Sequence, residues 1–202
     1  MTKRFFSLVV AMLFICIASV GLAEVNTIDK PEDMEFIGGL HFGESISSAK
    51  SDMAKVYGVS TSRIDEWENG EGTTVLGEGN SKQSCTIAGI SNCKVRCLFS
   101  EGTGTKKIIQ VCYFLPTDAA DPIKDALESK YGNGEFVDMT ASGTMKYKWI
   151  IEKNKDSEGT DFYISIWLYY PLYSNEKVEI YYVLNGALRN EYDKITVNMN
   201  GL

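Results

Sequence analysis

The sequence predicts an α+β fold in which two helices and a set of short antiparallel strands form one compact globular body. Two segments have apolar residues at helical spacing, and each ends at a Tyr-Gly pair, Tyr57-Gly58 or Tyr131-Gly132. Short runs of alternating apolar residues, separated by glycine-bearing turns, follow each segment. This order indicates a helix followed by an antiparallel β-meander, present twice.

Residues 1–23 have the pattern of a cleavable secretory signal peptide. The pattern is a positive start, an uncharged apolar run and small residues before the cleavage point: Lys3 and Arg4, residues 5–17, then Gly21 and Ala23 before Glu24. The apolar run is near the lower length limit for a membrane span, so an uncleaved anchor is the alternative. Lipidation at Cys16 is disfavoured because the bulky Ile15 precedes it.

Cleavage would leave an acidic chain. It removes two of the 20 basic residues and none of the 27 acidic ones, so the formal net charge goes from −7 to −9. A phosphate backbone would repel such a chain, which argues against nucleic-acid binding. Because no second apolar run approaches the length of a span, the mature chain is not expected to cross a membrane. We expect a secreted protein, or one of the periplasm or cell envelope.

Four cysteines remain after cleavage: Cys85, Cys93, Cys97 and Cys112. An even number in an exported chain predicts disulfides, with free buried thiols as the alternative. Their spacing fits no paired zinc pattern, and no histidine lies nearby. In an extended strand Cys93 and Cys97 share a face but lie too far apart to bond each other. Each is therefore expected to bond a neighbouring strand, one to Cys85 and the other to Cys112.

The expected elements follow from the change in apolar period along the chain. Ser45 or Ser47 suits the N-cap of the first helix, and glycine ends both helices. In chain order the elements are a lead-in over 24–35, helices over 46–57 and 123–131, a helical turn over 62–68 anchored by Trp67, strands over 73–76, 85–90, 93–99, 107–115, 145–151, 161–170 and 177–184, and a candidate edge strand over 195–197.

The two helix-plus-meander segments align at an offset of 74 residues. Ala49 and Met53 then coincide with Ile123 and Leu127, so the helices agree in apolar phase. A meander with one apolar face needs a helix or a sheet on that face, and the repeat provides a helix for each. We therefore expect two tandem units, with the helices packed on one face of the sheet. The divisions are a signal peptide (1–23), a lead-in segment (24–35), a first unit (36–115) and a second unit (116–202).

A short phrase adds a family resemblance to this architecture. The run from Gly38 to Ala49, followed by a meander with Ala88-Gly89-Ile90, resembles exported bacterial proteins of the β-lactamase inhibitor protein type. The pattern is also similar to small outer-membrane assembly lipoproteins. The resemblance covers most of residues 36–184 and implies helix-plus-meander units and a binding role. The chain departs from the inhibitor type in its cysteine positions and offers no matching inhibitory loop.

The sequence offers no catalytic, cofactor or metal motif. The single histidine, His41, has no partnered nucleophile motif, so we interpret it as a surface or packing residue. The glycine clusters near residues 77–82 and 102–104 lack the features of phosphate-binding loops and are interpreted as turns. Residues 156–161 lack calcium-loop spacing and indicate a hairpin turn. No cofactor is expected, and a hydrolase with paired carboxylates stays the third hypothesis.

The best candidate binding surface lies on the last two predicted strands. Phe162, Ile164, Ile166 and Leu168 alternate as a core face in one strand, and Val178, Ile180 and Tyr182 do so in the next. The alternation places four aromatic residues on the other side of the sheet: Tyr163, Trp167, Tyr169 and Tyr181. Tyrosine and tryptophan suit binding surfaces because they combine large apolar bodies with polar tips. The alternative is that this side packs against the other unit or the tail.

The working hypothesis is therefore a non-enzymatic exported binding module. It would use the aromatic side of the sheet to recognise a protein or a cell-envelope glycan. An envelope structural or assembly factor is the second hypothesis.

Overall fold

A sheet of ten strands organises the protein. The computed structural model describes residues 27–78, 84–87, 89–101, 105–141, 143–153, 161–172 and 177–193. Only β1 (Thr27–Ile28) pairs in parallel there, with the end of β8 (Thr144–Lys153). The predicted α+β class with an antiparallel sheet is confirmed. The predicted signal peptide (1–23), the predicted turns at 102–104 and 156–161 (except Asp161), and the candidate strand 195–197 lie outside the described residues.

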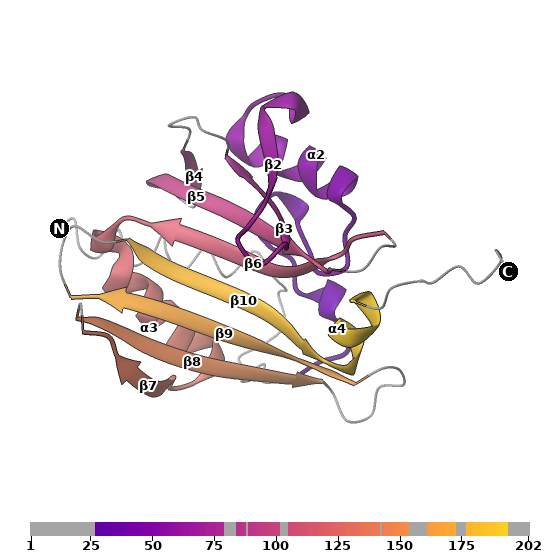
Figure 1. The fold of residues 1–202 in the computed structure, drawn as a ribbon. Helices are drawn as coiled ribbons and strands as arrows, with labels where there is room; N and C mark the ends of the chain where they lie inside the picture. The colour runs from indigo at the N-terminus through magenta and orange to yellow at the C-terminus, as the bar shows by residue number, and fades with distance from the viewer. Residues whose placement is uncertain are drawn as a thin grey trace, which may run out of the picture.

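Along the chain, two helices are each followed by a run of strands (Figure 1). After β1 come the 3-10 turns η1 (Pro31–Asp33) and η2 (Ile37–Gly39), α2 (Ile46–Tyr57), η3 (Thr61–Arg63), β2 (Ile64–Glu68), β3 (Thr74–Glu78), β4 (Cys85–Ile87), β5 (Ile90–Phe99), β6 (Ile108–Leu115), η4 (Thr117–Ala119), α3 (Ala120–Tyr131), β7 (Glu135–Met139), β8, β9 (Phe162–Pro171), β10 (Val178–Gly186) and α4 (Ala187–Tyr192).

The strand order in the sheet is β1-β8-β9-β10-β6-β5-β3-β2, with β7 also on β8 and β4 also on β5. Most neighbours are hairpin-connected, but β6 and β10 are distant in sequence. They pair antiparallel over six residue pairs, from Val178 opposite Leu115 to Val183 opposite Gln110. This pairing joins the strands that precede α3 in the sequence and the strands that follow it into one continuous sheet.

Both predicted helices form for the local reasons that the sequence suggested. Ser45 caps α2, since its hydroxyl accepts a hydrogen bond from the backbone N–H of Ser48. Gly58 ends α2 in the left-handed conformation with φ of 64°, which glycine adopts without strain. Helix α3 begins at Ala120, three residues before the predicted start, because η4 leads directly into it.

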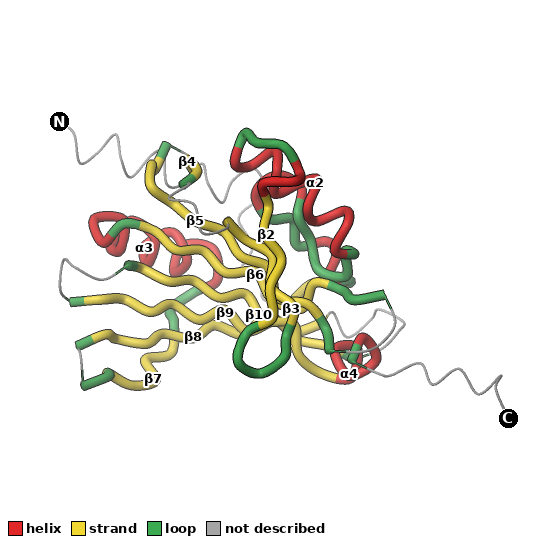
Figure 2. The backbone as a smooth tube through the Cα atoms, turned by 45° about the horizontal axis from the view of Figure 1, so that its top comes forward, coloured by secondary structure: helices red, strands yellow, loops and turns green. Residues whose placement is uncertain are grey.

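The core is one cluster of buried residues from the helices and the strands. Ala49 and Met53 of α2 and Ile123 and Leu127 of α3 belong to one buried cluster with alternate residues of the strands. In Figure 1, α3 lies behind β8, β9 and β10, and α2 lies beside β2 and β3 in both Figure 1 and Figure 2. All seven residues predicted as the core sides of the last two strands are buried there: Phe162, Ile164, Ile166, Leu168, Val178, Ile180 and Tyr182.

The two sides of the sheet differ in chemistry. Successive side chains of a strand point to opposite sides, and directly opposed residues of paired strands share a side. We call the side with Tyr163, Trp167, Tyr169 and Tyr181 the aromatic face, and the side that joins the buried cluster the core face. No helix in the described residues is long and apolar enough to cross a membrane.

Two local predictions differ from the structure. The segment predicted as a helical turn around Trp67 contains the short η3 and then strand β2, because residues 64–68 pair with β3 throughout. Strand β7 was not predicted, because all five of its residues are exposed and its sequence has no apolar alternation to reveal it. In both cases pairing with a neighbouring strand decides the structure and local pattern does not.

The predicted disulfides are absent among the described residues, where all four cysteines are buried thiols. Cys93 and Cys97 share the core face, as predicted, but Cys112 lies on the aromatic side of β6, opposite Arg96. Cys97 and Cys112 therefore point to different sides of the sheet and cannot bond. Cys85 and Cys93 are opposed across β4 and β5, yet the Cys93 thiol donates to the carbonyl of Ile90 at 3.1 Å.

Gly134→Ala is expected to lower the free energy of unfolding by about 1–3 kcal/mol, because it overpacks the core. An added Cβ would lie 2.4–2.8 Å from ring atoms of Trp149. Trp149 is buried, and its indole N–H donates to the carbonyl of Gly132 at 2.8 Å, so the ring has little room to move. Urea unfolding followed by circular dichroism measures the difference.

Gly70→Ala is the matched control, because its added Cβ would meet no atom within 4 Å. We expect this variant to unfold like the natural protein. Equal stability of the two variants would show that Trp149 is not fixed as described.

Candidate functional site

The four predicted site residues lie on the aromatic face, on β9 and β10. Trp167 is directly opposite Tyr181, and the rings of Tyr169 and Tyr181 have centroids 5.2 Å apart. Tyr163 stands opposite Asn185 further along the strands and is 40% exposed. The other three are half-buried. The structure thus brings Trp167, Tyr169 and Tyr181 together and leaves Tyr163 beyond them.

A line of alternating rings and cations extends this cluster across the sheet. The ring of Tyr181 lies 6.3 Å from that of Phe114 on β6, in an edge-on arrangement. The guanidinium carbon of Arg96 on β5 lies 4.8 Å from the Phe114 centroid and 5.7 Å from that of Trp67 on β2. Because a ring face is electron-rich, each such contact is attractive.

The other flank of the cluster repeats the arrangement on β8. The ammonium of Lys148 lies 4.9 Å from the Trp167 ring, and that of Lys146 lies 5.7 Å from the Tyr169 ring. Each lysine is directly opposite the ring that it covers, so backbone pairing sets the contact. Lys146 also forms an ion pair of 3.3 Å with Asp138 of β7. Cations on β5 and β8 therefore flank the central rings.

Because Gly77 has no side chain, the Trp67 ring has room in this line. Gly77 of β3 lies next to both Trp67 and Arg96, and a Cβ there would come within 2.9 Å of the Trp67 ring and 3.0 Å of Arg96. The ring can cover the backbone at this position only because glycine has no side chain. The sequence of β3 thus permits the contact between β2 and β5 across it.

Glu179 fixes the orientation of the central tyrosine. It is the direct neighbour of Phe114 and Tyr169, and its carboxylate accepts a short hydrogen bond from the Tyr181 hydroxyl. Burial, and then this hydrogen bond, raise the pKa of Tyr181 above its ordinary value. The phenol therefore stays protonated and keeps its hydrogen on Glu179.

Sequence reasoning missed several members of this surface: Trp67, Arg96, Phe114, Lys146 and Lys148. Alternation alone places Phe114 on the side opposite Val111 and Leu115, so that signal was present. The contacts of the basic residues depend on register between strands that are distant in sequence, which the sequence does not reveal. Trp67 was missed because its segment was assigned to a helical turn.

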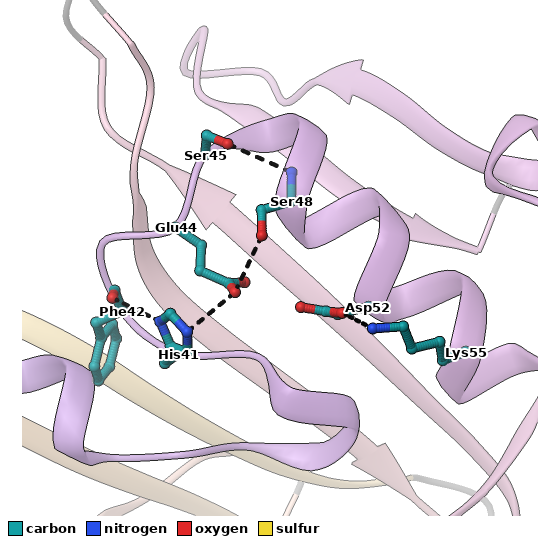
Figure 3. A network of polar contacts seen from close by, with 7 residues as sticks. All are labelled: His41, Phe42, Glu44, Ser45, Ser48, Asp52 and Lys55. Atoms are coloured by element: carbon teal, nitrogen blue, oxygen red, sulfur yellow. Dashed lines mark hydrogen bonds and ion pairs between the residues drawn. The ribbon is translucent and has the colours of Figure 1, made fainter.

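A separate cluster of polar side chains lies at the start of α2, away from the aromatic face (Figure 3). The Glu44 side chain is 95% buried and its carboxylate receives contacts from His41 Nε2 at 3.2 Å and from the Ser48 hydroxyl at 3.4 Å. Asp52 faces it from the next turn of α2 and pairs with Lys55. Burial raises the pKa of Glu44, His41 opposes that shift, and the charge of Asp52 adds to it.

This cluster is not arranged for nucleophilic catalysis. In a serine triad the histidine stands between nucleophile and carboxylate, whereas here Glu44 stands between Ser48 and His41. The thiols do not replace the serine, because burial raises the pKa of Cys93 to about 11 and that of Cys112 to about 12. The described residues contain no group of three or more metal-ligating side chains placed to hold an ion. The aromatic face is therefore the candidate site.

Comparisons of the chain with models of known protein families, with curated proteins and with solved structures found no match. The function is therefore argued from the residues of this chain.

Glu44→Gln is expected to raise the free energy of unfolding at pH 8 by roughly 1 kcal/mol, because it removes a buried carboxylate whose Oε2 has no hydrogen-bond partner. The raised pKa means that the folded state holds this proton more tightly than the unfolded state. The natural protein therefore loses stability as the pH rises from the ordinary value of 4.5 through the folded pKa. A neutral amide does not ionise, so the variant escapes this loss.

The difference in the free energy of unfolding between Glu44→Gln and the natural protein should shrink as the pH falls toward 4, where residue 44 is uncharged in both proteins. Urea unfolding at several pH values measures it. Glu66→Gln, which changes an exposed carboxylate paired with Lys50, controls for net charge. A Glu44→Gln variant that is less stable than the natural protein at pH 8 would contradict the interpretation that the buried Glu44 carboxylate destabilises the fold.

Proposed function

We propose that the protein is an exported, non-enzymatic binding module that recognises a protein or a cell-envelope glycan through the aromatic face. The observation that carries this proposal is the line of rings and cations from Trp67 to Lys146, across strands β2, β5, β6, β10, β9 and β8. Tryptophan, tyrosine and arginine are the residues that most often dominate binding energy at protein interfaces.

The contacts within the line also reduce the cost of binding. Lys148 lies over Trp167, and Tyr181 is held both by Glu179 and by the edge of Tyr169. Side chains that already occupy one arrangement lose little conformational entropy when a ligand covers them. Neighbours on the same face contact these rings, and in this proposal the remaining ring surface is the part that a partner covers.

The order of elements supports the two-unit interpretation of this surface. One segment gives α2 followed by β2, β3, β5 and β6, and the other gives α3 followed by β7, β8, β9 and β10. In this interpretation the helices lie on the core face and the aromatic face spans both units. The resemblance to inhibitor proteins of the β-lactamase inhibitor type, which implies a binding role, is part of the same proposal.

A structural or assembly role in the envelope is the second candidate. Edge strand β7 favours it, because Phe136 and Met139 are 55% and 57% exposed. An apolar edge is a site at which another chain can add a strand. Recovery with envelope complexes, in place of one soluble ligand, would favour this role.

The double variant Trp167→Ala, Tyr169→Ala is expected to lose its partner while remaining folded. The two rings lie at the centre of the face and outside the buried cluster, so their removal should affect binding more than stability. The mature protein and the variant are immobilised, exposed to envelope extracts, and compared by quantitative mass spectrometry. Circular dichroism on heating checks the fold.

Phe136→Ala is the matched control, because it removes an exposed ring from β7 on the opposite side of the sheet. It should keep every component that the natural protein captures. Unfolding of the double variant would show that the rings are structural. Capture unchanged in a folded double variant would place binding elsewhere.

A further inference from the structure

A short backbone pairing joins the start of α2 to the start of β6. The Gly43 N–H donates to the carbonyl of Ile108 at 3.0 Å, and the Ile108 N–H donates to the carbonyl of Glu44 at 2.9 Å. Ser45, the N-cap of α2, stands opposite Lys107 in the same pairing. We call the pairing of residues 43–45 with residues 107–108 the α2 attachment. The backbone of Glu44 belongs to this attachment, while its side chain lies in the polar cluster of Figure 3.

The polar cluster places two carboxyl groups against each other. The Glu44 side chain is 95% buried, and its Oε2 has no hydrogen-bond partner among the described residues. The carboxylate of Asp52 points toward it from α2 (Figure 3). Ionised carboxylates only accept hydrogen bonds, whereas a protonated carboxyl group also donates one. A single proton on Glu44 therefore supplies the missing donor and removes the repulsion between two like charges.

His41 responds to protons in the same direction. Its Nε2 lies 3.2 Å from Glu44 Oε1, and its Nδ1 lies 3.4 Å from the carbonyl oxygen of Phe42. Both neighbours are acceptors, and only the doubly protonated imidazolium donates through both ring nitrogens. The His41 side chain is 40% exposed, so it can exchange protons with solvent. Mildly acidic solution thus completes the hydrogen bonds of His41 as well as those of Glu44.

The other groups around Glu44 do not reverse this direction. Cys97 of β5 is a titratable group that faces Glu44 from the sheet, and burial raises the pKa of its thiol well above the ordinary value, so it stays neutral. The Lys55 ammonium lies 2.5 Å from Asp52 Oδ1 and stabilises the ionised form of Asp52. Glu44 is therefore the carboxyl group of the pair that takes the proton.

We infer that the polar cluster is a pH-dependent switch that strengthens the α2 attachment in mildly acidic solution and weakens it in alkaline solution. In acid, Glu44 donates its proton to the Asp52 carboxylate, and the His41 imidazolium donates to both of its neighbours. In alkali, the ionised Glu44 side chain is repelled by Asp52 and favours solvent. Because the backbone of the same residue bonds Ile108, movement of this side chain weakens the attachment of α2 to β6.

The direction of the switch follows from the proton affinity of the folded state. Burial raises the pKa of Glu44, His41 opposes that shift, and the charge of Asp52 adds to it. A folded pKa above the ordinary value of 4.5 means that stability is lost as the pH rises through the folded pKa. A salt-bridged carboxylate shows the opposite dependence, since it loses stability in acid. This inference does not depend on what the aromatic face binds.

Two NMR measurements on the mature chain test the switch between pH 4 and pH 8.5. The side-chain carboxyl carbon of Glu44 reports its ionisation, and the midpoint should lie above 4.5. Amide hydrogen exchange at Gly43 and Ile108, corrected for the intrinsic effect of pH on exchange, reports opening of the α2 attachment. Protection of both amides should fall at least about tenfold as the pH rises past the midpoint, which corresponds to a shift of about one pKa unit.

Asp52→Asn should lower the midpoint of Glu44, because an amide carries no charge and can donate a hydrogen bond to the carboxylate. The fall in protection should become smaller in this variant, and Glu44→Gln should abolish it. Asp125→Asn is the matched control, because it makes the same change at an exposed position of α3. It should behave like the natural protein in both measurements.

Three results would overturn the inference. Glu44 could ionise at or below its ordinary value of 4.5. Its midpoint could be the same in Asp52→Asn and Asp125→Asn, which would show that Asp52 does not act on it. A raised midpoint without any change in the protection of Gly43 and Ile108 would show that Glu44 titrates without affecting the α2 attachment.

Discussion

The pairing of β6 with β10 is the constraint on which the rest of the structure depends. The six residue pairs between these strands make one sheet out of strands that precede and follow α3. Without this pairing, two strand edges would expose their backbone groups, and the two helices would share no core. The pairing also places Phe114 beside Tyr181, so the line of rings extends from β10 to β6 only because the sheet is continuous.

Local sequence signals predicted much of the fold. Helix α2 could be predicted because Ser45, Gly58 and its apolar spacing are independent signals that agree. The long strands alternate clearly between buried and open positions, so β5, β9 and β10 were found within a few residues. Strand β7 and the segment around Trp67 were not, because their structure comes from pairing with partners, and their own residues show no alternation.

The candidate site was predictable in its centre and unpredictable at its margins. Alternation within β9 identified Trp167 and Tyr169, since that signal is contained in one strand. The roles of Arg96 and Lys148 depend on the register between strands, which a single sequence does not fix. The cysteines illustrate the same limit, because the face of Cys112 relative to Cys97 depends on pairing between two strands.

The cations of the aromatic face hold its half-buried rings in an ordered arrangement. A bare row of rings would be an apolar patch prone to association. Lys146, Lys148 and Arg96 cover part of each ring with a charged group, which keeps the surface hydrated and holds the rings in position. If the face binds a partner as proposed, that partner would have to satisfy or displace these cations as well as cover the rings. A partner with both an apolar side and hydrogen-bond acceptors meets both requirements.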